Sequence, residues 1–202
     1  YTEDREAIAR RIATERGAEI VPSYEHPDII AGQGTAGLEI AEQAEELDVS
    51  PDQVLICCGG GGLTAGCAVA LKARLPDVGV FTVEPEHYDD TARSLANGER
   101  QRVTTSERSI CDALLTDSPG KLTFDIMRRL VNGGLVVTDA DVKEAMRFAF
   151  RNLKLVVEPG GAVALAAVLA GRLPTAGKTT VVVLSGGNVD FGLFAEIQGE
   201  LA

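Results

Sequence analysis

Apolar residues form short, unbroken runs along much of the chain. Runs rich in Val, Ile or Leu predict strands at Ala18–Pro22, Val54–Cys58, Gly79–Glu84, Leu135–Val137 and Thr180–Leu184. Most of these runs lack the polar alternation of a strand with one wet face. They are therefore typical of a parallel sheet that helices cover on both faces.

Longer segments with helical spacing lie between these runs. They predict helices from about Thr2 to Arg16, and at Thr35–Leu47, Leu63–Arg74, Lys121–Asn132, Asp139–Asn152 and Gly161–Gly171. Gly17 is a stop signal for the first helix, and Thr138 is a start signal for the fifth. The alternation predicts an α/β fold with an open, twisted, mostly parallel sheet, which binds ligands at the carboxyl ends of its strands.

Four consecutive glycines, Gly59–Gly62, follow the predicted strand Val54–Cys58 and precede a predicted helix. Residues without side chains let successive amide N–H groups approach an anion, and the helix N-terminus adds roughly half a positive charge. The sequence therefore predicts that this segment, which we call the glycine loop, binds a phosphorylated ligand or cofactor.

A dinucleotide-binding turn is one alternative for this loop. Gly60, Gly62 and Ala65 approximate the G-x-G-x-x-G/A pattern, and Glu84 ends the next strand where a ribose-binding acid belongs. However, four glycines in a row exceed what such a turn needs. We therefore rank an oxidoreductase that uses a dinucleotide last among the candidate functions.

Composition excludes several classes of function. The net charge is −11, with no Lys/Arg-rich run, which argues against nucleic acid or an anionic membrane surface as a partner. No apolar stretch is long enough to cross a bilayer, and no leader opens the chain, so we expect a cytoplasmic protein. The four cysteines show no CxxC spacing and only two histidines exist, His26 and His87, which disfavours a zinc site or a hydrolase triad.

A second glycine-rich strand end, Ser185–Asp190, follows Thr180–Leu184. Together with the glycine loop it resembles the fold-type II pyridoxal-phosphate enzymes, in particular the threonine and serine dehydratases and serine racemase. The matching pieces occur in family order over nearly the whole chain. They are Ala31–Thr35, Gly59–Leu63, Cys111–Ala113, Pro119–Phe124, Val157–Ala162 and Ser185–Asp190.

The resemblance implies a tryptophan synthase β-like fold with pyridoxal 5′-phosphate as cofactor. Gly59, Gly60, Gly61, Gly62 and Leu63 would hold the phosphate through backbone amides, as the glycine loop suggests independently. Ser185 would face the pyridine nitrogen, and Glu158 would lie near the cofactor ring. A neutral hydroxyl at the nitrogen does not enforce a protonated ring, which suits β-elimination.

The resemblance also implies a metal site. In the racemase and some dehydratases, two carboxylates with a main-chain carbonyl between them bind Mg²⁺, Mn²⁺ or Ca²⁺. Here the ligands would be Glu84, the carbonyl of Tyr88, and Asp90. The alternative is an acidic turn exposed to solvent.

The chain departs from the family in one respect. No Ser-Phe-Lys segment is present, and none of its lysines has the context of the Schiff-base lysine; they are Lys72, Lys121, Lys143, Lys154 and Lys178. The loop that grips the substrate carboxylate is missing too. Since both belong to the family's N-terminal part, we expect a truncated or nicked enzyme. Residues 1–28 would be the tail of the small domain and residues 29–202 the large domain that binds the cofactor.

The expected function of the parent protein is the conversion of L-threonine or L-serine to a 2-oxo acid and ammonia, while this chain alone is expected to be inactive. A serine racemase or a 3-hydroxyaspartate dehydratase would share every motif. From another class, the chain could be a non-catalytic cofactor-binding or regulatory subunit, which a companion chain that bears the lysine would exclude.

Two further expectations follow from the resemblance. The sequence ends twelve residues after Asp190, so we expect no C-terminal regulatory domain and no control by isoleucine. We expect the enzyme to be a homodimer that binds a hydroxy amino acid, and the missing N-terminal segment of the same protein to complete the site.

Overall fold

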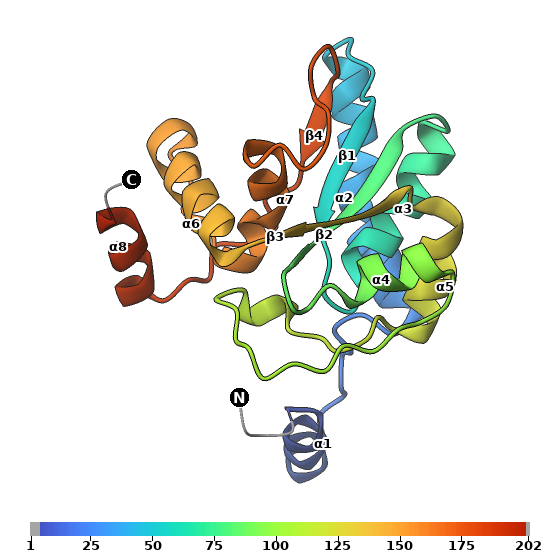
Figure 1. Cartoon of the computed structure of the whole chain (residues 1–202). Coiled ribbons are helices and arrows are strands. Elements are labelled where there is room, and N and C mark those ends of the chain that lie inside the picture. Colours follow the sequence, from blue (N-terminus) through green and yellow to red (C-terminus); the bar gives the residue numbers. More distant parts are fainter. Residues whose placement is uncertain (1–4, 201–202) are drawn as a thin grey trace.

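A parallel sheet forms the centre of the molecule. The computed structural model describes residues 5–200, and helices lie on both sides of its four strands (Figure 1). The strands are β1 (Gln53–Cys57), β2 (Gly79–Pro85), β3 (Gly133–Val137) and β4 (Thr180–Val182). Their order is β3-β2-β1-β4, and every neighbouring pair is parallel. The predicted α/β class and parallel sheet are confirmed.

Helices connect and cover these strands. They are α1 (Arg5–Arg16), α2 (Pro27–Glu46), α3 (Gly62–Arg74), α4 (Asp90–Asn97), α5 (Lys121–Leu130), α6 (Asp139–Phe148), α7 (Pro159–Leu169) and α8 (Phe191–Gly199), with a 3-10 turn η1 (Asp112–Leu114) and a π turn η2 (Ala149–Leu153). Within the described residues, no helix combines the length and apolarity that crossing a bilayer requires.

Successive residues of β1 contribute to two different cores. Leu55 and Cys57 belong to a cluster built with α6 and α7, whereas Val54 and Ile56 belong to a cluster built with α3. Because side chains alternate across a strand, both sets are buried only if helices cover both faces. This explains why β1 has an unbroken apolar sequence.

Close packing of α2 on α3 corrects one predicted boundary. The sequence predicts a helix from Thr35, but α2 begins at Pro27, with His26 as its N-cap. Gly34 lies inside this helix, where a Cβ atom would approach the carbonyl oxygen of Gly66 in α3 to 2.8 Å. Glycine here permits close contact between two helices and does not break α2.

Three other expectations need correction. The predicted strand Ala18–Pro22 is irregular, and Val21 is 74% exposed. A strand needs a neighbour to bond to, and the described residues provide none there. Helices α4 and α8 were not predicted, and α4 lies in a stretch that was expected to be irregular. Residues 2–4 of the first predicted helix lie outside the described part, and α1 itself stands apart from the body of the molecule (Figure 1).

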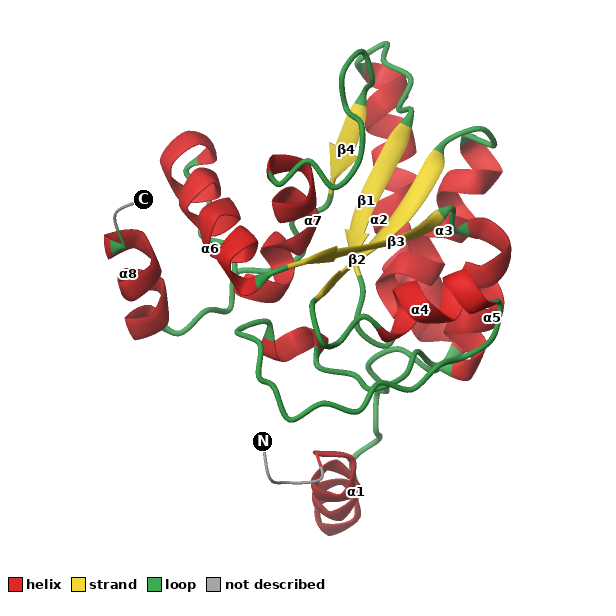
Figure 2. Cartoon of the chain, viewed as in Figure 1, coloured by secondary structure: helices red, strands yellow, loops and turns green. Residues whose placement is uncertain are grey.

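The topology indicates where a ligand binds. From β1 the chain continues to β2 on one side, whereas β4 pairs with β1 on the other side. In open α/β sheets such a switch point creates a crevice outside the carboxyl ends of the strands. The loops after β1 and β4 flank this crevice, and the long segment between α4 and α5 runs along the same end of the sheet (Figure 2).

Candidate cofactor site

The glycine loop lies at the end of β1 and is enclosed by other parts of the chain. Gly60, Gly61 and Gly62 are buried. A Cβ on Gly61 would lie 2.6 Å from the Cε of Met127 in α5, and the φ of Gly61 is 94°, a left-handed conformation that favours glycine. These positions need glycine both for backbone geometry and for close packing.

Two donors fix the orientation of the loop. The hydroxyl of Thr123 donates to the carbonyl oxygen of Gly60 at 2.7 Å, and the N–H of Gly120 donates to the same oxygen at 3.1 Å. In a planar trans peptide the C=O and N–H groups point in opposite directions. The N–H of Gly61 therefore points away from α5.

The amides of the loop have no hydrogen-bond partner in the described part of the chain. Across residues 5–200, the amide nitrogens of Gly59, Gly60 and Gly61 make no hydrogen bond. The amides of Gly62 and Leu63 lie in the first turn of α3, where an N–H group has no acceptor within the helix. Buried amides without a partner are rare and costly. Together with the dipole of α3, they form a site that fits a phosphate group.

Ser185 lies in the loop after β4, and Glu158, the N-cap of α7, lies beside the same loop. The thiol of Cys57, the last residue of β1, lies 3.2 Å from the Ser185 hydroxyl. The Glu158 N–H donates to the carbonyl of Gly186 at 3.0 Å, and the Glu158 carboxylate accepts from the N–H of Asn188 at 2.9 Å. The structure thus connects Ser185 to β1 and Glu158 to the loop after β4.

The Cys57 thiol stays neutral at this place. Burial raises the pKa of Cys57, and the nearby Glu158 carboxylate acts in the same direction, while the hydrogen bond with Ser185 opposes them. Ser185 therefore lies beside an uncharged thiol. Ser185 could donate a hydrogen bond to the nitrogen of a pyridine ring. The donor oxygen of Ser185 carries no negative charge, unlike a carboxylate.

The predicted metal ligands are close in the chain but differ in their bonding. Both oxygens of Glu84 accept backbone N–H groups at the start of α4, from Thr91 at 2.8 Å and Ala92 at 2.7 Å. Both carboxylate oxygens of Asp90 are buried without a partner, and burial raises the pKa of Asp90 to about 7. No group of three or more His, Cys, Asp or Glu side chains in the described part is arranged to hold a metal ion.

The bonding of Glu84 argues against the dinucleotide interpretation. A ribose-binding acid must face the crevice and accept from hydroxyl groups of the ligand. Glu84 is fully buried and its oxygens are bonded to α4. Glu84 is therefore not exposed to the crevice, as a ribose-binding acid must be.

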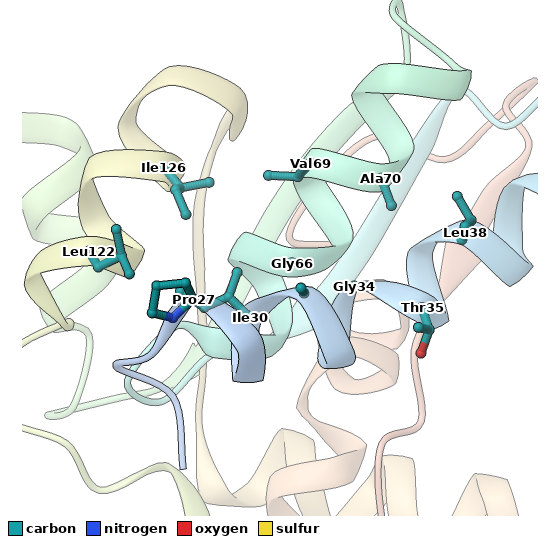
Figure 3. Close-up of a pocket in the computed structure, with 11 residues that line it drawn as sticks. Pro27, Ile30, Gly34, Thr35, Leu38, Gly66, Val69, Ala70, Leu122 and Ile126 are labelled. Atoms are coloured by element: carbon teal, nitrogen blue, oxygen red, sulfur yellow. The ribbon is translucent and has the colours of Figure 1, made fainter. Parts of the chain in front are cut away.

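A separate cavity of about 410 Å³ lies between α2, α3 and α5 (Figure 3). Its lining is apolar and includes Ile30, Leu38, Val69 and Ile126. It has no charged residue in its lining, so it does not fit a phosphate or an amino acid. Its lining includes no residue of Gly59–Leu63 or Ser185–Asp190.

Several residues around the glycine loop were not assigned a role from the sequence. They include Tyr24, which contacts Gly60 and Gly62, and Gln33 and Thr123, which lie in the motif pieces Ala31–Thr35 and Pro119–Phe124. The motif pieces were recognisable, but their contacts with the loop depend on packing between distant segments. Only the fold reveals them.

Comparison with known proteins agrees with this site. Residues 1–186 match the family described as pyridoxal-phosphate dependent enzyme. An L-threo-3-hydroxyaspartate ammonia-lyase from Pseudomonas sp is 40% identical over 97% of this chain. The T.th. threonine deaminase has a TM-score of 0.86 and 45% identity over 95% of this chain, and maize serine racemase has a TM-score of 0.83 and 35% identity over 97%.

The match covers only part of each relative. The chain spans 60% of the ammonia-lyase, 62% of the deaminase and 59% of the racemase. The relatives are an ammonia-lyase, a deaminase and a racemase, and the two solved structures share the fold of this chain. The family match agrees with the enclosed loop of amides and with the Ser185 hydroxyl beside β1. The chain therefore belongs to the pyridoxal-phosphate-dependent enzymes.

Proposed function

We propose that the parent protein is a pyridoxal-phosphate-dependent ammonia-lyase that acts on L-threonine or L-serine, and that this chain provides a large part of its cofactor site. The observation that carries the proposal is the juxtaposition of two glycine-rich strand ends at the switch point between β1 and β4. One end offers unpartnered amides, and the other offers Ser185.

The proposed division of labour follows from the chemistry of the two ends. The amides of Gly59–Leu63 would hold the phosphate, and Ser185 would hydrogen-bond the pyridine nitrogen, with Glu158 near the ring. When bound, the cofactor supplies an electron sink for the substrate carbon next to the amino group. A hydroxyl at the nitrogen gives a weaker sink than a carboxylate, which favours rapid loss of the β-hydroxyl group.

The overall reaction removes water from the hydroxy amino acid and then adds water to release ammonia, leaving a 2-oxo acid. It needs a lysine that accepts the α-proton. Three of the chain's lysines are bonded elsewhere. Lys72 donates to the carbonyl of Val78, and Lys154 donates to the carbonyl of Arg151. Lys143 pairs with Glu200 at 2.6 Å. We therefore propose that the lysine comes from the N-terminal part of the parent protein, and that the chain alone is inactive.

A second candidate is an ammonia-lyase for 3-hydroxyaspartate, which the 40% identity with the Pseudomonas enzyme favours. Serine racemization is a third, supported by the maize relative. The test is to incubate the full-length protein and pyridoxal 5′-phosphate with each hydroxy amino acid. Ammonia and oxo-acid release from threonine or serine supports the first proposal. Release from 3-hydroxyaspartate alone, or D-serine without ammonia, replaces it with the second or third.

A cation at Asp90 is part of the proposal. Its two carboxylate oxygens are buried and unbonded, and a divalent cation held also by the Tyr88 carbonyl and Glu84 would satisfy them. We expect Mg²⁺, Mn²⁺ or Ca²⁺ to raise the melting temperature of the chain, since a ligand of the native state stabilises it. Asp90→Asn should remove this effect, whereas the exposed Asp112→Asn should keep it. An equal rise in both variants would contradict a site at Asp90.

The partners of the chain are proposals of the same kind. We propose that the intact enzyme is a homodimer and that its N-terminal segment packs on this chain. Light scattering of the full-length protein would test the first point. Co-purification of the separately expressed N-terminal segment with this chain would test the second.

A further inference from the structure

The segment Ser23–His26, between α1 and α2, lies across the glycine loop. A Cβ atom on Gly60 would overlap Cδ1, Cε1 and Cζ of the Tyr24 ring at nearly equal distances, as when a ring presents its face. A Cβ on Gly62 would lie 2.8 Å from the Cβ of Tyr24. Tyr24 therefore covers two of the four glycines at van der Waals contact.

Hydrogen bonds hold the residues on both sides of Tyr24. The carbonyl of Ser23 accepts from the side-chain amide of Gln33 in α2 at 3.1 Å. The Glu25 carboxylate accepts from the N–H of Leu122, in the first turn of α5, at 2.7 Å. We call Ser23–His26 the clasp, because Ser23 and Glu25 bond to α2 and α5, the helices on either side of the glycine loop.

The clasp and the loop depend on the same helix end. The N–H of Gly120 donates to the Gly60 carbonyl, while Glu25 bonds to Leu122 two residues later. A carboxylate at the N-terminus of α5 also interacts favourably with the dipole of that helix. The backbone next to Tyr24 is thus held at the same helix end that holds the peptide of Gly60.

We propose that Tyr24 is a positioning residue that keeps the glycine loop in its anion-binding conformation. Glycine has more backbone freedom to lose on ordering than any other residue, and an ordered loop binds its ligand without that cost. The ring restricts Gly60 and Gly62 in the absence of ligand. This inference rests on the proposed role of the loop in holding the cofactor phosphate.

The clasp lies in the connection between two helices. It joins α1, in the part predicted to end the small domain, to α2, which packs on α3. On this proposal, a shift of the N-terminal part would reach the glycine loop through Tyr24.

The first test is binding of pyridoxine 5′-phosphate by the 202-residue chain, measured by equilibrium dialysis. This probe lacks the aldehyde, so it cannot attach to surface lysines. Tyr24→Ala should weaken binding at least about tenfold, whereas Tyr24→Phe, which keeps the ring face, should stay within about twofold of the original chain. Phe191→Ala removes an aromatic ring that is 83% exposed and should leave the affinity unchanged.

Equal binding by Tyr24→Ala would overturn the proposal. Tighter binding would also overturn it, because it would mean that the ring occupies the place of the ligand. If Tyr24→Ala does not fold, Glu25→Ala replaces it. This variant breaks the bond to Leu122 without touching the loop, and we expect weaker binding; unchanged binding would overturn the proposal.

A second measurement needs no ligand. Amide hydrogen exchange should be faster for Gly59–Leu63 in Tyr24→Ala than in the original chain, with the amides of β1 unchanged as the internal reference. Unchanged exchange in the loop would contradict a positioning role. If the original chain does not bind the probe, the proposed function fails, while the exchange result still decides whether Tyr24 orders the loop.

Discussion

The carboxyl ends of β1 and β4 have similar glycine-rich sequences but very different surroundings. Gly60–Gly62 after β1 are buried beneath side chains from the clasp, α2 and α5. Ser185 after β4 is exposed, and β4 pairs with β1 alone among the described strands. This chain therefore encloses the end that fits a phosphate and leaves the other end open on one side.

This contrast indicates how the site is divided along the sequence. The relatives are longer, since this chain spans about 60% of their length. We infer that the phosphate end is complete within this chain and that the ring end is completed by the rest of the parent protein. The expected inactivity of the chain and its expected ability to bind phosphate are then compatible.

The strongest test of the phosphate end is Gly61→Ala. Its φ of 94° and the nearby Met127 both oppose a side chain. We expect a loss of stability of about 1–3 kcal/mol in urea unfolding, and at least about tenfold weaker binding of pyridoxine 5′-phosphate.

Gly32→Ala is the matched control for this variant. Gly32 lies in α2, and no atom lies within 4 Å of the position that a Cβ would take there, so alanine should be neutral or stabilise the helix. Equal effects of the two substitutions would remove the distinction between the enclosed loop and an ordinary helical glycine.

Ser185→Ala should separate the two ends with a smaller effect. Since Ser185 is exposed, its loss should change the free energy of unfolding by less than about 0.5 kcal/mol. Binding of pyridoxine 5′-phosphate should weaken by a factor of about 3–10, the loss of one hydrogen bond, while binding of inorganic phosphate stays the same. Weaker binding of both probes would show that the two ends do not act separately.

The smallest expected effect concerns Asp141, which bonds to Thr138 and Arg172. Burial works to raise its pKa, but the N–H of Thr138 and the guanidinium of Arg172 outweigh burial and lower it. A lowered pKa means that the contribution to stability is present above the unfolded pKa of about 4 and is lost as the pH falls.

Asp141→Asn should therefore reduce stability at pH 7 by about 1 kcal/mol or less, since the ion pair with Arg172 is partly exposed. The difference from the original chain should shrink below pH 4 in urea unfolding curves, and phosphate binding at pH 7 should not change. Altered phosphate binding would show that the scaffold and the phosphate end are coupled.

Sequence patterns locate the centre of the fold well. Three predicted elements match β1, α3 and β2, and no boundary differs by more than one residue. They are Val54–Cys58, Leu63–Arg74 and Gly79–Glu84. Long apolar runs followed by glycine give clear signals there. The predicted strand Ala18–Pro22 is wrong because apolar content alone does not supply a pairing partner.

The site could be predicted only in part. The glycine loop, Ser185 and Glu158 carry motifs, and the structure brings Ser185 to Cys57 and Glu158 to Asn188. Tyr24 carries no such signal, because its contact with Gly60 depends on how the segment before α2 folds over α3. The helix predicted from Thr35 begins in the structure at Pro27, and Gly34 within it lies against Gly66 of α3.

A complete phosphate end within this chain is the inference on which the others depend. Equilibrium dialysis of the chain with pyridoxine 5′-phosphate, inorganic phosphate and unphosphorylated pyridoxine examines it without the rest of the parent protein. We predict that both phosphate compounds bind and compete with each other, while pyridoxine does not bind measurably. Equal binding of pyridoxine and its phosphate ester, or no binding of either phosphate compound, would contradict the inference.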